Sequence, residues 1–139
     1  MDKLVLFKLE YCPHCINFKE PHNYGALKEK LKSDTETKDI QYYEYESLKD
    51  ITDIKREIEL ARKSDKIKGV PTLCLFYARK KFDIIDIDVW KNKETKKIDV
   101  EKIFESIKES LITMKRDDYK NKYIKYKIKY LELKNKYLH

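Results

Sequence analysis

Glycine, proline and cysteine are all scarce in this chain. Its 139 residues include 2 glycines, 3 prolines and 3 cysteines. Collagens and disordered low-complexity chains are rich in glycine or proline, and small disulfide-bonded scaffolds are rich in cysteine, so the composition excludes these classes. The chain is long enough to bury a core as one globular unit, and we expect it to contain long helices.

Long apolar runs are also missing. A membrane-spanning helix needs about 18 apolar residues, whereas Lys8 and Glu10 interrupt the apolar run that begins near the N-terminus. The same interruption argues against a secretory signal. We therefore expect no membrane span and a reducing, cytoplasmic compartment, in which a pair of cysteines is more often catalytic than structural.

The basic excess is concentrated at the C-terminal end. The net charge is +7, and residues 115–139 carry nine Lys and Arg against three Asp and Glu. The preceding residues are close to neutral, with 23 bases and 22 acids. We therefore predict a domain over residues 1–114 and a basic, Tyr- and Lys-rich tail over residues 115–139.

The spacing of apolar residues predicts alternating strands and helices. Strands are predicted at residues 3–9, 40–46, 72–77 and 82–89, the last two as a hairpin. Helices are predicted over residues 12–33, 51–61 and 100–111. Asp50 and Asp99 are the expected N-caps of the second and third helices, and Pro21 and Gly25 should break the first near His22. The order βαβα–ββα indicates an α/β fold, with a central mixed sheet flanked by helices and a helical C-terminal extension.

A dithiol follows the first predicted strand. Cys12, Pro13, His14 and Cys15 form a C-x-x-C motif, and Pro13 takes the first helical position, where proline is well accommodated. Cys12 then lies at a helix N-terminus, where backbone amides and the helix dipole stabilise a thiolate. These positions predict thiol–disulfide exchange, with Cys12 as nucleophile and Cys15 as the shielded resolving thiol. His14 is the expected residue that lowers the pKa of Cys12.

A second segment supports this interpretation. Val70, Pro71 and Thr72 open another apolar run, and the Val-Pro bond is a candidate cis peptide in a loop that faces the dithiol. The main chemical alternative is a zinc site, which needs four ligands. The chain has no second C-x-x-C and no H-x₃₋₅-H, so we expect no metal. Cys74 lies inside the apolar run, where a free cysteine acts as a small hydrophobe.

Both segments resemble the signature segments of the thioredoxin superfamily. The resemblance is strong over residues 6–15 and 66–76 and weak elsewhere between residues 3 and 113. It implies a thioredoxin-like fold and a thiol–disulfide oxidoreductase that acts on protein thiols and disulfides, with no cofactor besides its own Cys12–Cys15 disulfide. It also implies that Val70, Pro71 and Thr72 bind extended substrate. The Pro-His pair between the cysteines is similar to that of strongly oxidising disulfide donors.

Three features depart from the family pattern. Thioredoxins place a buried acid beneath the dithiol, and Leu6 occupies the matching strand position here. Glutaredoxins bind glutathione with a Gly-Gly turn, whereas residues 82–89 contain no glycine. The stretch between Cys15 and Pro71 is also longer than in a minimal thioredoxin. The first difference argues against thioredoxin-type proton transfer, the second argues against classical glutathione-dependent activity, and the third is a feature that could alter substrate choice.

The tail has a repeat of its own. Apolar residues recur there at spacings of 4, 3, 4, 3 and 4, at Tyr119, Tyr123, Tyr126, Tyr130, Leu133 and Tyr137. This is a heptad repeat in a lysine-rich helix. Three interpretations stay open: the helix packs back on the domain, it self-associates as a coiled coil, or it binds nucleic acid or another anionic partner.

The tail composition resembles that of many proteins of giant nucleocytoplasmic DNA viruses. This resemblance implies a viral origin and a location in the host cytoplasm or the virion. Two alternatives to an enzyme remain open. One is a redox-inactive structural or virion component of the same fold, in which Cys12 is dispensable. The other is a nucleic-acid-binding protein that acts through residues 115–139.

Overall fold

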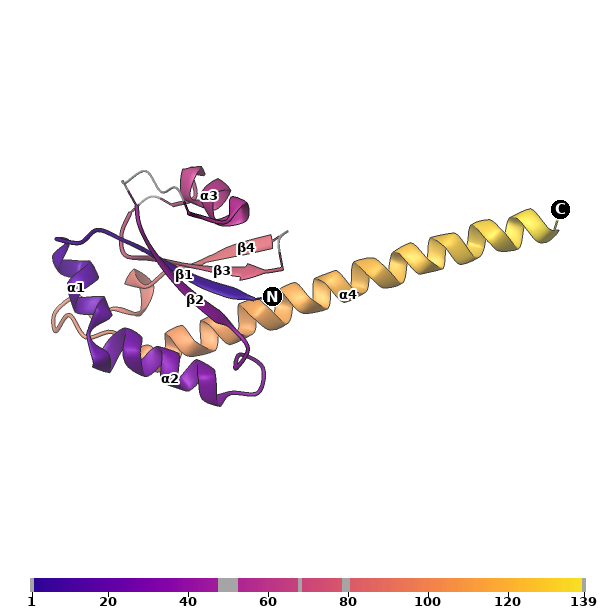
Figure 1. Ribbon diagram of the computed structural model, residues 1–139. Helices are drawn as coiled ribbons and strands as arrows, with labels where there is room; N and C mark the ends of the chain where they lie inside the picture. The colour runs from indigo at the N-terminus through magenta and orange to yellow at the C-terminus, as the bar shows by residue number, and fades with distance from the viewer. Residues whose placement is uncertain (1, 48–52, 68, 79–80, 139) are drawn as a thin grey trace.

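The computed structural model describes residues 2–47, 53–67, 69–78 and 81–138, which form an α/β structure around one mixed sheet (Figure 1). Within these ranges the strands are β1 (Lys3–Lys8), β2 (Gln41–Glu46), β3 (Thr72–Tyr77) and β4 (Lys81–Ile85), in the spatial order β2-β1-β3-β4. β1 pairs parallel with β2 and antiparallel with β3, and β3 pairs antiparallel with β4. The predicted class, mixed sheet and hairpin are confirmed.

The strand β1 is buried on both of its faces. Side chains alternate along a strand, so Leu4 and Leu6 face one layer of the core while Val5 and Phe7 face the other. All four side chains are fully buried. Burial on both sides explains why this segment is a continuous apolar run rather than an alternating one.

One face of the sheet is covered by α1 (Pro13–Lys19), α2 (Ala26–Ser33) and the first part of α4 (Val100–Leu138) (Figure 1). A π-helical turn over Pro21–Gly25 joins α1 to α2, so the predicted break near His22 is confirmed. Pro21 lacks the backbone amide that would continue α1. Apolar side chains of these helices pack on β1 and β3, namely Phe18, Leu27, Leu31, Ile103, Ile107 and Leu111.

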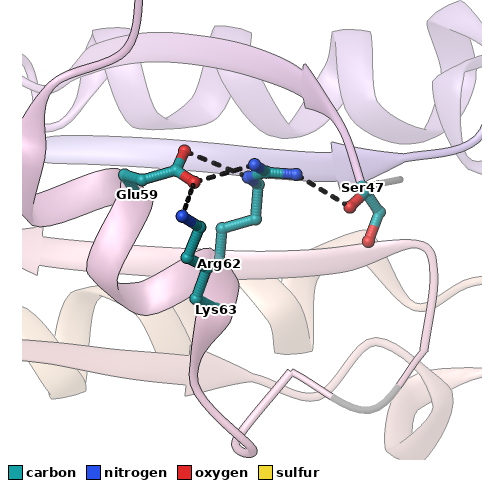
Figure 2. A network of polar contacts seen from close by, with 4 residues as sticks. All are labelled: Ser47, Glu59, Arg62 and Lys63. Carbon is teal, nitrogen blue, oxygen red and sulfur yellow. Dashed lines mark hydrogen bonds and ion pairs between the residues drawn. The ribbon is translucent and has the colours of Figure 1, made fainter. Parts of the chain in front are cut away.

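The opposite face is covered by α3 (Arg56–Lys63), which packs Ile58 and Ala61 against the sheet. Figure 2 shows how Arg62 connects this helix to the chain that leaves β2. The Arg62 guanidinium donates a hydrogen bond of 2.8 Å to the Glu59 carboxylate and one of 3.1 Å to the Ser47 carbonyl oxygen. The contact fixes α3 relative to the end of the parallel strand pair.

The predicted start of this helix is wrong. The helix begins at Arg56, with Lys55 as the N-cap and no side-chain capping hydrogen bond, whereas Asp50 lies outside the described residues. Ile54 packs on the same apolar cluster as Ile58, although it lies in irregular chain before the helix. A four-residue spacing of apolar side chains therefore arises here without a helical turn.

The hairpin and the start of α4 follow the prediction more closely. The second hairpin strand ends at Ile85, before a 3₁₀ turn over Asp88–Trp90, so it is shorter than the predicted segment. The Asp99 carboxylate accepts a hydrogen bond of 3.2 Å from the backbone N–H of Lys102. This bond confirms Asp99 as the N-cap of α4.

The helix α4 does not end near Leu111. It is one helix of 39 residues that continues to Leu138, so the charge boundary at residues 114 and 115 lies inside it. Where α4 leaves the body, the Tyr77 hydroxyl donates a hydrogen bond of 3.2 Å to the Asp118 carboxylate. Beyond that point the helix projects away from the sheet (Figure 1). The side chains of residues 119–137 are all exposed. The interpretation in which the tail packs back on the domain is therefore wrong.

None of the helices in the described ranges could span a bilayer, because none joins sufficient length to sufficient apolar character.

Candidate active site

The dithiol lies between the end of β1 and the start of α1. Cys12 is the N-cap: its backbone is extended, with φ −79° and ψ 120°, and its carbonyl oxygen accepts a hydrogen bond of 3.0 Å from the Ile16 N–H. Pro13 occupies the first turn, as predicted. This helix start leaves Cys12 partly exposed and turns Cys15 inward, where only 2% of it is exposed. Both are free thiols.

The loop before β3 reaches the same edge of the sheet. Phe7, near the end of β1, pairs with Thr72, the first residue of β3, because the two strands are antiparallel. The residues that precede β3 therefore lie beside the chain that leads from β1 to the dithiol. The Val70–Pro71 peptide bond is cis, as predicted, and Val70, Pro71 and Thr72 are partly exposed.

The surroundings of Cys12 lower its pKa from the usual cysteine value of 9.0. The largest cause is the backbone N–H of Cys15, and it acts against the smaller cost of partial burial. The thiol of Cys15, the backbone N–H of His14 and the positive charge of Lys91 lower the pKa further. These backbone amides lie at the N-terminus of α1, where the helix dipole also favours a thiolate.

The surroundings of Cys15 have the opposite effect. Burial is the largest cause of its raised pKa, and the thiol of Cys12 adds to it. The Leu9 backbone N–H donates to Cys15 Sγ at 3.5 Å and, together with the charge of Lys8, offsets part of this rise. Cys12 therefore ionises while Cys15 is still protonated, so one helical turn holds a reactive thiolate and a shielded thiol.

Lys91 is a site residue that the sequence prediction missed. Its Nζ lies 2.9 Å from His14 Nδ1. A lysine ammonium only donates hydrogen bonds, so Nδ1 of His14 is the acceptor in this contact. The cation that lowers the pKa of Cys12 is Lys91. That the His14 side chain itself lowers this pKa stays a prediction.

A charged cluster borders the buried thiol. Glu44 of β2 is opposite Leu6 in the parallel register and forms ion pairs with Lys8 and Lys19 at 3.2 Å and 3.1 Å. Cys15 and both lysines line a groove of about 400 Å³. Partial burial disfavours the charged carboxylate, but the two lysines still hold the pKa of Glu44 below its usual value. Glu44 is thus an ionised carboxylate on the strand beside β1, paired with two lysines that line the groove next to Cys15.

The third cysteine lies on the other side of the sheet. Cys74 is fully buried in the core layer under α3, and burial raises its pKa to about 12. It is the small hydrophobe that the sequence predicts, separated by the sheet from α1. In the part of the chain that the structure describes, no group of three or more His, Cys, Asp or Glu could hold a metal ion. His22 is exposed in the turn after α1.

Comparison with known proteins identifies no relative of this chain. No protein-family model matches it, and no curated protein or solved structure matches it either. A functional proposal therefore rests on the residues themselves: a partly exposed thiol with a lowered pKa, a buried thiol three residues later, and a cis-proline loop at the same edge of the sheet.

Proposed function

We propose that this protein is a thiol–disulfide oxidoreductase of thioredoxin-like fold that exchanges disulfides with protein substrates through Cys12 and Cys15. The observation that carries the proposal is the opposite shift of two pKa values within one C-x-x-C motif. Exchange in two steps needs such a pair, because an accessible thiolate must attack first and a shielded thiol must react second. The strand order β2-β1-β3-β4 supports the fold assignment.

The reductive direction begins with attack of the Cys12 thiolate on one sulfur of a substrate disulfide. The other substrate sulfur leaves as a thiolate and takes up a proton, and a mixed disulfide joins Cys12 to the substrate. Cys15 then loses its proton and attacks Cys12 Sγ, which releases the second substrate thiol and forms the Cys12–Cys15 disulfide. Two electrons pass from the dithiol to the substrate. In the oxidative direction the same bonds form and break in reverse.

The second step requires Cys15 to become a thiolate despite its raised pKa. Formation of the mixed disulfide removes the negative charge of Cys12, which is one of the causes of that raised pKa. The charge of Lys8 acts in the same favourable direction. Cys15 is therefore easier to ionise in the mixed disulfide than in the reduced protein, which favours release of the substrate once it is bound.

The direction of electron flow follows from the Cys12 thiolate. Groups that stabilise the Cys12 thiolate stabilise the reduced, dithiol form of the protein. They thereby make the Cys12–Cys15 disulfide a stronger oxidant. We therefore propose that the protein forms disulfides in its substrates more readily than it reduces them. Exposed Tyr11 and Ile16 flank the dithiol and offer apolar contact to flexible polypeptide, with extended substrate placed along Val70, Pro71 and Thr72.

The test is catalysed oxidative refolding of a reduced test protein, together with the reduction potential of the dithiol in glutathione buffers. We expect a potential nearer to about −120 mV, typical of a strong disulfide donor, than to about −270 mV, typical of thioredoxin. Cys12→Ser should abolish catalysis. Cys74→Ala is the matched control and should retain it, because Cys74 lies on the other face of the sheet. Full activity of Cys12→Ser would contradict the proposed role of Cys12, and absence of catalysis by the parent protein would favour the redox-inactive structural component.

A further inference from the structure

The projecting part of α4 presents a continuous apolar seam to solvent. The seam consists of the heptad residues Tyr119, Tyr123, Tyr126, Tyr130, Leu133 and Tyr137, whose exposed fractions lie between 54% and 82%. Residues three and four apart share one side of a helix, so these side chains form a single stripe. We call this stripe the tyrosine seam.

The tyrosine seam is not a continuation of the core-facing side of α4. The core side carries Ile103, Ile107 and Leu111, all fully buried against the sheet. At about 100° of rotation per residue, the seam is turned by about 120° from the direction of these three side chains. The change of direction explains why the helix leaves the body with its second apolar stripe uncovered.

Lysines line both edges of the tyrosine seam. If Tyr123, Tyr130 and Tyr137 are the a positions of the heptad, the other seam residues are the d positions. The six e and g positions that border the seam are then all lysine: Lys120, Lys122, Lys127, Lys129, Lys134 and Lys136. Residues 119–137 contain seven lysines in total, so the positive charge is concentrated beside the seam rather than around the helix.

This arrangement disfavours pairing with a second copy of the chain. In a parallel coiled coil each g position faces an e position of the partner, and in an antiparallel one g faces g and e faces e. Every such pair between two copies would place lysine against lysine. Repulsion between like charges at these positions destabilises a complex of two copies. The seam is thus apolar enough to bind a helix, while the lysines that border it disfavour pairing with a second copy of the chain.

We propose that the tyrosine seam binds a different protein through an amphipathic helix that carries Glu or Asp at its own e and g positions. The complex is a heterotypic coiled coil in which the partner covers the tyrosines and its acids pair with the six lysines. The surface goes beyond the redox site and does not depend on it, because it begins where α4 leaves the sheet. It supplies a docking element through which the body is held near a partner.

Nucleic acid is the other anionic partner that the lysines could attract. Phosphates need basic residues but no apolar repeat of alternating three- and four-residue spacing, which is the spacing of a helix–helix interface. The outward f positions also carry no charge, because they are Asn121, Ile128 and Asn135. The sequence pattern therefore favours a helix over a phosphate backbone.

The test measures binding of synthetic probes to the full chain at about 150 mM salt. The first probe is a fluorescent peptide of about four heptads with Leu at a and d and Glu at e and g. The second has the same composition in an order that breaks the heptad, and the third replaces Glu by Lys. Single-stranded and duplex DNA of similar length complete the set. We expect the first peptide to bind with a Kd on the order of micromolar. The other two peptides and both DNA probes should bind at least about tenfold more weakly.

Matched variants separate the seam from the rest of the helix. The double variant Tyr126→Ser with Tyr130→Ser should weaken binding at least about tenfold, because it removes two seam side chains. The control, Ile124→Ser with Ile128→Ser, removes apolar side chains from the far side and should change binding less than about twofold. All four residues are exposed, so the body should fold normally in both variants.

A second pair of variants tests the charge pattern. Lys129→Glu reverses a charge beside the seam and should weaken binding at least about threefold, whereas Lys125→Glu makes the same change away from it and should have less effect. Equal losses in the two variants of either pair would overturn the proposal. So would tighter binding to DNA than to the acidic heptad peptide, or self-association of the full chain at micromolar concentration by light scattering.

Discussion

Cys12 and Cys15 are one helical turn apart, but their two thiols have different environments. Cys12 is partly exposed at the helix end with a lowered pKa, and Cys15 is buried beneath the same turn with a raised pKa. A substrate disulfide can reach only the first sulfur without local opening of the helix. The order of attack is therefore set by position before any difference in pKa is considered.

We expect Cys15→Ser to accumulate mixed disulfides with protein substrates, because Cys12 still attacks and no resolving thiol remains. Cys12→Ser should neither exchange nor trap, since both remaining thiols, Cys15 and Cys74, are buried. Nonreducing electrophoresis followed by mass spectrometry of the trapped species measures both outcomes. Trapping by Cys12→Ser through Cys15 would reverse the assignment of the two roles.

Lys91 gives a prediction about pH. The thiolate is the reactive species, so the alkylation rate of Cys12 rises with pH until the pKa is passed, and the lowered pKa places the midpoint below 9.0. Lys91→Met removes a positive charge that favours the thiolate. We therefore expect its midpoint to move to higher pH, as measured by iodoacetamide labelling of Cys12 with mass spectrometry. Lys93→Met, which removes an equal charge nearby in sequence, is the control.

His14 should act partly through Lys91. Because His14 Nδ1 accepts the hydrogen bond from Lys91 Nζ, His14→Tyr removes the group that holds the lysine in place. We expect this variant also to raise the pKa of Cys12, and the double variant with Lys91→Met to raise it by less than the sum of the two. Strictly additive effects would show that His14 acts on the thiolate independently of Lys91.

The dithiol and the proline loop before β3 could be predicted from the sequence, whereas Lys91 and Glu44 could not. Cys12, Pro13 and Cys15 are positioned by one helix start, whose signals all lie within a few residues. Lys91 comes from a segment 77 residues beyond His14, and nothing distinguishes it among 32 Lys and Arg. Glu44 is likewise brought to the site only by the pairing of β2 with β1.

At the scale of elements, the predicted starts of α3 and α4 had different outcomes for a physical reason. At Asp99 the capping side chain and the apolar repeat point to the same helix start, and the structure has a capping bond there. At α3 the repeat was misleading, because Ile54 reaches the core from outside the helix. Apolar spacing reports which residues are buried, and it identifies a helix only where the backbone signals agree.

The cap of α4 should contribute measurably to stability. Asp99→Ala removes the acceptor for the Lys102 N–H and should lower the free energy of unfolding by about 1 kcal/mol, as loss of an N-cap typically does. Asp99→Asn keeps a capping oxygen and should lose much less. Urea denaturation of the three proteins measures the difference. Equal stability of the alanine variant and the parent protein would contradict a capping role.

At the scale of the whole molecule, α4 belongs both to the folded body and to the projecting tail. The charge step at residue 115 lies a few residues before the point, beyond Asp118, at which α4 projects away from the sheet. It does not indicate a break in the helix. Residues 100–138 contain no glycine and no proline, which was the available signal that one helix continues through the boundary.

The body should therefore fold without the tail, provided that the cut leaves its core intact. A chain ending at Lys120 keeps Leu111 and Met114 in the core and the Tyr77–Asp118 hydrogen bond. The described side chains that it loses, those of residues 121–137, are all exposed, so we expect its Tm within about 4 °C of the full chain and an undiminished dithiol activity.

A chain ending at Ser110 is the informative contrast. It removes Leu111, which is fully buried, and Met114, which is nearly so, and should be destabilised by about 3 kcal/mol or more because two apolar side chains leave the core. Calorimetry and disulfide-exchange assays on both shortened chains measure the outcomes. If the chain ending at Lys120 unfolded, residues 121–138 would have to stabilise the body, and the tail could not act as an independent docking element. If the chain ending at Ser110 were as stable as the full chain, the buried face of α4 would not be part of the core.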